Sequence, residues 1–256
     1  MIDFSHVTKS YPTGEVVLDD VSFDVAQGDL VVITGKSGAG KTTIGRLLIR
    51  DVMPTKGTIT IDGIDLAKMK SKDIPGLRRK IGVVFQDYKI IPDKTVYENI
   101  EYALQIAGVD KNKIPERIGH LLELVGIPGK ENLFPVQLSG GELQRASIAR
   151  AIASDPPILF ADEPTGNLDK ETSLEIFDLL KKINEAGTTI IMATHDVTLI
   201  ENNPARHIHL QHGKIVKDHD RSGKRKPTVE EEPKKEEDKE EHKNSKHHLE
   251  KDHEKK

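Results

Sequence analysis

A glycine-rich string in this sequence has the residue types and spacing that hold phosphate. Residues 35–42 read GKSGAGKT, fit the pattern GxxxxGK[ST], and lie between the apolar run Leu30–Thr34 and a helical stretch from about Thr42 to Ile49. Glycines let backbone N–H groups surround phosphate oxygens, and the following helix N-terminus adds a favourable dipole. The pattern predicts a nucleoside triphosphate site in which the lysine reaches the β- and γ-phosphates and the hydroxyl after it ligates Mg²⁺. Its expected residues are Gly35, Lys36, Ser37, Gly38, Ala39, Gly40, Lys41, Thr42 and Thr43.

Two adjacent carboxylates end a second apolar run. Asp162 and Glu163 follow Ile158–Ala161, and side chains that alternate along a strand point in different directions. We expect Asp162 to hold the Mg²⁺ shell through water, and Glu163 to orient and deprotonate the water that attacks the γ-phosphate. An acidic pair after a strand is more often a turn or a helix cap, so this interpretation depends on the phosphate loop elsewhere in the chain.

A serine and two glycines begin a further helical stretch and form a possible second anion site. The string at residues 138–142 is LSGGE, and the residues after it place apolar side chains at helical spacing. A serine hydroxyl and free N–H groups at a helix start can bind an anion, although an ordinary serine N-cap has the same appearance. The residues expected here are Ser139, Gly140, Gly141 and Glu142.

The elements that must position these strings follow an α/β pattern. Short buried runs such as Ile81–Phe85 and Thr189–Thr194 recur between helical segments, which is typical of a mostly parallel, helix-flanked sheet. Before them, Ile2–Tyr11 and Val16–Val25 flank a Pro-Thr-Gly turn and predict a hairpin. From about 95 to 150 the β-like runs stop, and amphipathic helical spacing predicts a helical insert.

Composition limits the classes of function. The chain has 256 residues, of which 31% are charged, and its formal net charge of −4 argues against generic nucleic-acid binding. It has no cysteine for a disulfide, and no apolar run long enough to span a bilayer, so we expect a cytoplasmic protein. The segment 221–256 is highly charged and nearly without aliphatic residues, which predicts a disordered tail. A solubilising role for this tail is favoured over binding of a partner or anionic lipid through residues 224–226.

Taken together, the three strings resemble the defining set of the ABC ATPases. The resemblance covers about residues 1–216 and implies an ATP-hydrolysing enzyme with ATP and Mg²⁺ as ligands. It implies one ABC-type P-loop NTPase domain over 1–220, with an N-terminal antiparallel β subdomain and a helical signature subdomain. The segment 221–256 would be an appended tail.

Further site residues are implied by this resemblance alone. Tyr11 corresponds to the aromatic residue that stacks on adenine, and Gln86 to the glutamine that contacts Mg²⁺ and the attacking water. Residues 167–169 are similar to the loop that crosses to a second subunit, and His195 to the histidine that contacts the γ-phosphate. Taken singly, Tyr11 is more often a sheet-face aromatic and His195 a surface residue. The expected catalytic residues are Glu163, His195 and Gln86, and the expected Mg²⁺ residues are Thr42, Gln86 and Asp162.

The resemblance also implies an assembly. In ABC ATPases the LSGGE string of one copy closes on the ATP held by the phosphate loop of another, which gives a head-to-tail dimer around two nucleotides. The segment 87–99 resembles that of the cell-division branch of the family. That branch pairs with an FtsX-like integral membrane protein at the inner face of the cell membrane, and its stroke activates peptidoglycan hydrolases.

Three alternatives remain at this point. The string at residues 164–169 is shared with ATPases of exporters and of lipoprotein release, which use the same chemistry with another membrane partner. A soluble ATPase acting on nucleic acid or in translation usually has two cassettes or a long coiled coil, whereas this chain has one LSGGE string. In a nucleotide-binding scaffold, turnover would be incidental.

Overall fold

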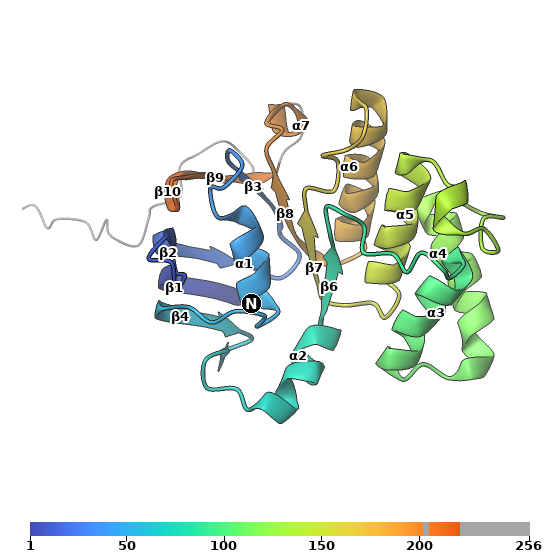
Figure 1. Cartoon of the computed structure of the whole chain (residues 1–256), viewed down its shortest axis with the longest axis horizontal. Coiled ribbons are helices and arrows are strands. Elements are labelled where there is room, and N and C mark those ends of the chain that lie inside the picture. Colours follow the sequence, from blue (N-terminus) through green and yellow to red (C-terminus); the bar gives the residue numbers. More distant parts are fainter. Residues whose placement is uncertain (202–204, 221–256) are drawn as a thin grey trace, which may run out of the picture.

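Two β-sheets with helices around them make up the computed structural model, which describes residues 1–201 and 205–220 (Figure 1). The predicted tail 221–256 lies outside the described residues. An antiparallel sheet contains the N-terminal strands, and a larger, mostly parallel sheet forms the centre of the molecule. The α/β class expected from the alternation of apolar runs and helical segments is therefore confirmed.

The antiparallel sheet contains the predicted N-terminal hairpin. Its strands run in the order β2-β1-β4-β5, and the rings of Phe4 on β1 and Phe23 on β2 stack with their centroids 4.5 Å apart. Alternating burial along these strands puts one face of the sheet against the core. The strands are β1 (Ile2–Ser10), β2 (Val16–Val25), β4 (Lys56–Ile61) and β5 (Ile64–Asp65).

The central sheet has the strand order β10-β9-β3-β8-β7-β6. The four pairings from β6 to β9 are all parallel, and β10 joins the edge antiparallel to β9. Parallel strands place their carboxyl ends at one edge of the sheet, so the loops after β3, β6, β7 and β8 meet there. The strands are β3 (Leu30–Thr34), β6 (Ile81–Val84), β7 (Ile158–Asp162), β8 (Thr189–Thr194), β9 (Arg206–Gln211) and β10 (Lys214–His219).

The helices fall into two groups. One group accompanies the sheets and comprises α1 (Lys41–Leu48), α2 (Ile74–Arg79), α6 (Lys170–Glu185) and α7 (Thr198–Glu201). The other group lies beyond β6 and α6 in Figure 1 and comprises α3 (Val96–Ala107), α4 (Ile114–Val125) and α5 (Gly140–Ala151). Short 3-10 helices cover Ser71–Asp73, Lys111–Lys113 and Pro135–Gln137.

Local signals fix the ends of the second group of helices. The side chains of Thr95 and Ser139 each accept the backbone N–H of the glutamate three residues on. The side chain of that glutamate accepts the backbone N–H of the cap residue in turn, so α3 and α5 both begin with a capping box. Gly108 and Gly126 end α3 and α4 in the left-handed conformation. These caps satisfy some of the free backbone groups and so fix where α3 and α5 begin and where α3 and α4 end.

Two buried clusters hold the layers together. One cluster joins the inner faces of α3, α4, α5 and α6 to one face of the central sheet. The other lies between the antiparallel sheet, α1 and the opposite face of the central sheet. Among the helices that the structure describes, none combines the length and the apolar composition needed to span a bilayer.

Candidate nucleotide-binding site

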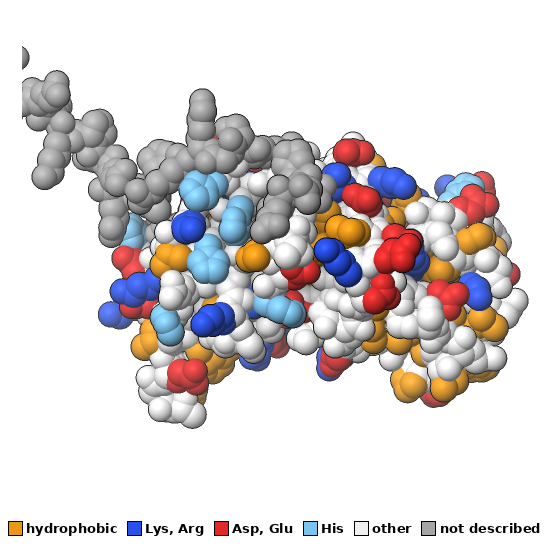
Figure 2. Space-filling model, turned by 90° about the horizontal axis from the view of Figure 1, so that it is seen from above, with side chains coloured by type: hydrophobic (Ala, Val, Ile, Leu, Met, Phe, Trp, Pro, Cys, Tyr) orange, Lys and Arg blue, Asp and Glu red, His pale blue; other side chains and the backbone are white. Residues whose placement is uncertain are grey.

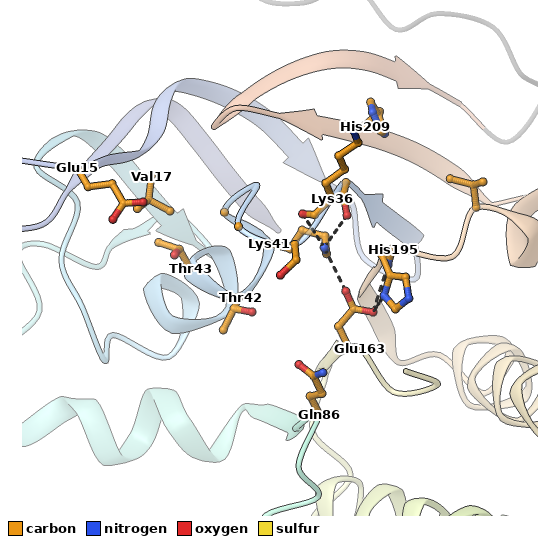
Figure 3. Close-up of a pocket in the computed structure, with 15 residues that line it drawn as sticks. Glu15, Val17, Lys36, Lys41, Thr42, Thr43, Gln86, Glu163, His195 and His209 are labelled. Atoms are coloured by element: carbon orange, nitrogen blue, oxygen red, sulfur yellow. Dashed lines mark hydrogen bonds and ion pairs between the residues drawn. The ribbon is translucent and has the colours of Figure 1, made fainter. Parts of the chain in front are cut away.

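A cavity of about 770 Å³ opens at the carboxyl ends of the parallel strands (Figure 3). Its walls come from the loops after β3, β6, β7 and β8, from the start of α1, and from β2 and β9. The structure thus brings most of the predicted phosphate-loop, catalytic and metal-binding residues together in one place. The lining residues are Glu15, Val17, Gly35, Lys36, Ser37, Gly38, Gly40, Lys41, Thr42, Thr43, Gln86, Glu163, His195, Val197 and His209.

The phosphate loop is held in shape by the packing of its glycines. Gly40 has a φ of +106°, and a Cβ there would lie 2.6 Å from Leu18 Cδ2 and 2.8 Å from the carbonyl oxygen of Val17. A Cβ on Gly35 would lie 2.4 Å from the carbonyl oxygen of Leu210. Because backbone and buried side chains leave no space, only glycine fits at these two positions. The loop therefore lies directly against the strands on both sides.

Lys41 is buried and folds back over the loop. Its Nζ donates to the carbonyl oxygen of Gly35 at 2.7 Å and to that of Lys36 at 3.3 Å. The same Nζ lies 3.1 Å from Glu163 Oε1, and the two side chains are only 6% and 10% exposed. A cation in such a low-exposure position is strongly attracted to an anion, because water screens the pair poorly.

Glu163 connects Lys41 to His195 (Figure 3). Its Oε2 accepts the backbone N–H of His195 at 3.2 Å and lies 2.8 Å from the Nδ1 of the same residue. Strand β7 ends at Asp162, and Glu163 has a left-handed φ of +48°. The expected alternation therefore does not extend to Glu163, because the strand stops between the two carboxylates and the backbone turns.

Asp162 fits a cation site. Its side chain is 7% exposed, and its Oδ1 has no hydrogen-bond partner among the described residues. Burial raises the pKa of this carboxyl group, while a hydrogen bond with Thr42 and the charge of Lys41 oppose the shift. A buried carboxylate oxygen with free acceptor capacity, beside a threonine hydroxyl, is the kind of oxygen-donor set that Mg²⁺ accepts directly or through water.

Gln86 and the loop after β7 also lie at the carboxyl edge of the central sheet. Gln86 is exposed and lines the cavity, and its backbone carbonyl accepts Asn167 Nδ2 at 3.5 Å. His195 is also exposed at the cavity wall. Two loops that the sequence singled out are therefore in direct contact beside the carboxylates.

A second cavity, of about 360 Å³, lies at the start of α5. Ser139 Oγ donates to Glu142 Oε2 at 3.0 Å, and Lys130 pairs with Glu142 Oε1 at 3.2 Å. None of these residues lines the first cavity. The second cavity is lined by Ser139, Gly140, Gly141, Glu142, Arg145, Asn167, Leu168, Asp169, Thr172 and Glu175. The structure therefore separates the LSGGE string from the phosphate loop within one copy of the chain.

Tyr11 does not line the first cavity. It lies just after β1, where its hydroxyl accepts Arg46 Nη1 at 3.1 Å and Lys9 Nζ lies 5.1 Å from the ring centroid. Its stacking on adenine stays a prediction. Glu15 and Val17 line the cavity instead; both follow the hairpin turn, and Val17 packs against Gly40. Their place in the hairpin beside the phosphate loop could be inferred only from the fold.

Sequence analysis also missed a pair of histidines on β9. Thr34 Oγ1, at the end of β3, lies 2.6 Å from His207 Nε2 and 2.8 Å from His209 Nδ1. Figure 2 looks down on this face and shows several histidine side chains where β9 and β10 lie. Alternation of histidine with apolar residues along 206–211 was the available signal, since it is typical of a strand with one polar face.

Comparison with known proteins decides the family. Residues 18–166 match the family model described as ABC transporter. The chain is 48% identical over 218 residues to the cell division ATP-binding protein FtsE of Streptococcus pneumoniae, a match that covers 85% of the chain and 95% of that protein. The chain belongs to the FtsE group of the ABC transporter family. The FtsE proteins of Bacillus subtilis and Escherichia coli K12 are 46% and 43% identical to this ABC ATPase, over 86% and 84% of the chain and 97% of each relative.

Solved structures agree with this ABC assignment. The dimeric structure of the ABC transporter cassette MJ0796 has a TM-score of 0.77 and 34% identity, covering 86% of this chain and 98% of that one. A second MJ0796 structure, of a post-hydrolysis state bound to ADP and phosphate, matches equally well. The chain thus has the ABC-type P-loop fold, with the antiparallel β subdomain and the helical subdomain described above, and its activity is ATP hydrolysis.

Proposed function

We propose that this FtsE-type ATPase pairs with an FtsX-like integral membrane protein and drives it by cycles of ATP binding and hydrolysis. The output would be activation of peptidoglycan hydrolases during cell division or wall growth. The observation that carries the proposal is the 48% identity to an FtsE protein over nearly its whole length, in a chain whose ATP-site residues converge on one cavity. Through its partner, the chain would be held at the inner face of the cell membrane.

In this proposal each residue of the site has its own role. The phosphate-loop backbone and Lys41 would bind the β- and γ-phosphates of ATP. A bound γ-phosphate would compete with Glu163 Oε1 for the Lys41 ammonium, which the structure shows paired at 3.1 Å. The carboxylate released in this way could take a proton from the attacking water, while His195 holds it through the contacts to Oε2. Hydrolysis would then depend on a local exchange of partners at Lys41.

Thr42, Asp162 and Gln86 would hold Mg²⁺, with Asp162 acting through water. The buried, unpartnered Oδ1 of Asp162 supports this part of the proposal. The ion would neutralise charge on the phosphates as it develops. The chain's own contribution would be to hold this carboxylate near the Thr42 hydroxyl, which opposes the rise in the pKa of Asp162.

A second copy of the chain would complete each site. Ser139, Gly140, Gly141 and Glu142 line a cavity apart from the phosphate loop, so they can contact the same ATP only if they come from another subunit. The dimeric structure of the related MJ0796 cassette supports this arrangement. We further propose that residues 1–220 act as one nucleotide-binding domain, with the helical insert at about 95–150, and that 221–256 is an appended tail.

Copurification tests the proposal. The full chain with Glu163→Gln would be expressed in the host with an affinity tag and isolated from detergent-solubilised membranes with ATP and Mg²⁺. We expect one integral membrane protein of the FtsX type in the eluate. The matched control is the double variant Lys41→Ala with Glu163→Gln, which should release it because ATP no longer closes the dimer. Recovery of a substrate-carrying permease instead would contradict the FtsE role, although not the ATPase assignment.

A further inference from the structure

The segment that connects β6 to α3 is shaped by two residues in the left-handed conformation. Tyr88 and Lys89 have φ values of +60° and +50°, although neither is glycine, and such backbone costs free energy unless its surroundings stabilise it. The segment begins at Gln86 in the nucleotide cavity and passes beside α5 before it enters α3 (Figure 1). Whatever holds Tyr88 and Lys89 therefore controls the path of the chain just after Gln86.

Arg150 on α5 holds both residues. Its Nη1 donates to the carbonyl oxygen of Lys89 at 2.6 Å, and its Nη2 donates to that of Tyr88 at 2.9 Å. Ser147, one helical turn earlier, donates from Oγ to the same Tyr88 oxygen at 3.2 Å. The left-handed turn aims two successive carbonyls at one guanidinium, which can donate from two nitrogens at once.

Among the described residues, no carboxylate pairs with the charge of Arg150. In the part of the chain that the structure describes, its side chain forms no ion pair, and burial lowers its pKa. The side chain is half-buried, and even partial burial of a cation without an anion is unfavourable. The two carbonyls supply the compensating negative ends of dipoles, which ties the arginine to the turn.

The rest of the segment is fixed from α3 and from the loop after β7. Buried Asn99 accepts the backbone N–H of Ile91 at 2.8 Å and donates to the carbonyls of Ile91, Lys94 and Thr95. At the other end, Asn167 donates to the carbonyl of Gln86 at 3.5 Å. With Asn99 holding the far end, the bonds from α5 leave Gln86 little freedom to shift along the cavity.

We propose that Arg150, supported by Ser147, is a positioning residue that sets the place of Gln86 in the nucleotide cavity. The proposal rests on the function proposed above, in which Gln86 contacts the attacking water and Mg²⁺. Arg150 does not line the nucleotide cavity, and its guanidinium donates to the carbonyls of Tyr88 and Lys89. Its loss should therefore reduce the rate of the chemical step and leave nucleotide affinity nearly intact.

A double-mutant cycle on the full chain tests this. Steady-state ATPase kinetics would be measured for Arg150→Met, Gln86→Ala and the double variant. We expect Arg150→Met to lower kcat by about tenfold or more with KM changed by less than about threefold, and to cause no further loss in the Gln86→Ala background. Arg150→Lys should restore little, because an ammonium on a flexible stem cannot reproduce the fork between two carbonyls.

Arg117→Met is the matched control, since Arg117 on α4 also donates to a backbone carbonyl, that of Ala153, and lies outside the nucleotide cavity. Its kcat should be unchanged. If Arg150→Met fails to fold, Ser147→Ala replaces it in the same cycle, with a smaller loss expected. Equal losses from Arg150→Met with and without Gln86 would overturn the proposal, as would a normal kcat. If Gln86→Ala alone keeps full turnover, the role proposed for Gln86 fails first.

Discussion

The carboxylate of Glu163 is bound at both ends: Oε1 lies 3.1 Å from Lys41 Nζ, and Oε2 lies 2.8 Å from His195 Nδ1. The two contacts link the start of α1, the end of β7 and the end of β8 through a single side chain. In the proposed mechanism Lys41 would also contact the γ-phosphate, and the family resemblance implies the same contact for His195. In that mechanism Glu163 would link phosphate binding to activation of the water.

Replacing Glu163 with glutamine should separate ATP binding from hydrolysis. The amide keeps the shape of the side chain but cannot accept a proton from water, so we expect kcat to fall roughly 10²–10⁴-fold while ATP binding and ATP-dependent dimerisation persist. Phosphate release and light scattering with ATP and Mg²⁺ measure the two properties. Glu123→Gln, an exposed position on α4, serves as the control and should keep full turnover. Normal hydrolysis by Glu163→Gln would exclude Glu163 as the base.

Two substitutions at Tyr11 can separate stacking from its hydrogen bond. Tyr11→Phe removes the hydroxyl that accepts Arg46 Nη1 but keeps the ring, whereas Tyr11→Ala removes both. If the ring stacks on adenine, Tyr11→Ala should weaken ATP affinity by about 1–2 kcal/mol and Tyr11→Phe should bind nearly as well as the parent. Titration with a fluorescent ATP analogue measures the affinities. Equal weakening by both variants would mean that the contact with Arg46 matters and the stacking does not.

Much of this architecture could be predicted because short-range signals coincide with the fold. The strand-loop-helix around Lys41, the hairpin and the capping boxes at Thr95 and Ser139 each depend on residues close together in sequence. Strands β4, β5, β9 and β10 were not anticipated, since glycine, charged residues and histidine interrupt their apolar runs and tertiary pairing decides their conformation.

Within the site, residue types could be predicted but their contacts could not. The pairing of Glu163 with Lys41 joins residues far apart in sequence, and the left-handed conformation of Glu163 leaves no local signature. The same holds for the contact between Thr34 and the two histidines of β9. Such contacts depend on the parallel order of β3, β8 and β7, which no single segment encodes.

Glycine at position 40 should be indispensable, and glycine at position 119 should not. Gly40→Ala places a methyl group 2.8 Å from the carbonyl oxygen of Val17 at a φ of +106°, so the phosphate loop must move or strain. We expect a loss of ATP affinity and of stability by about 2 kcal/mol or more. Gly119 lies in α4 with open space around its Cβ position, and alanine there should stabilise the fold by about 0.5–1 kcal/mol. Urea unfolding and ATP titration measure both, and a fully active Gly40→Ala would contradict the packing of the loop.

Asp162→Asn should raise stability while it abolishes turnover. Burial raises the pKa of Asp162, so the folded state keeps this proton to a higher pH than the unfolded chain does. The unfolding free energy therefore falls as pH rises from the unfolded value, about 3.9, through the raised folded value, and at neutral pH the ionised carboxylate is a net cost. Asparagine does not titrate. In urea unfolding without Mg²⁺ or nucleotide, the advantage of Asp162→Asn should be largest at pH 7 and shrink as the pH approaches 4.

Asp169 provides a control in which the pKa shift, and its effect on stability, have the opposite sign. It caps α6 by accepting the N–H of Thr172, and this hydrogen bond lowers the pKa of its carboxyl group. Its ionised form therefore stabilises the fold above the unfolded pKa, and that contribution is lost as the pH falls through the folded value. Asp169→Asn should remove this contribution and should therefore be less stable than the parent at pH 7. If Asp162→Asn were instead less stable than the parent at pH 7 in the absence of Mg²⁺, the ionised Asp162 would be paired in the fold, and its proposed role as a free acceptor for the metal shell would be wrong.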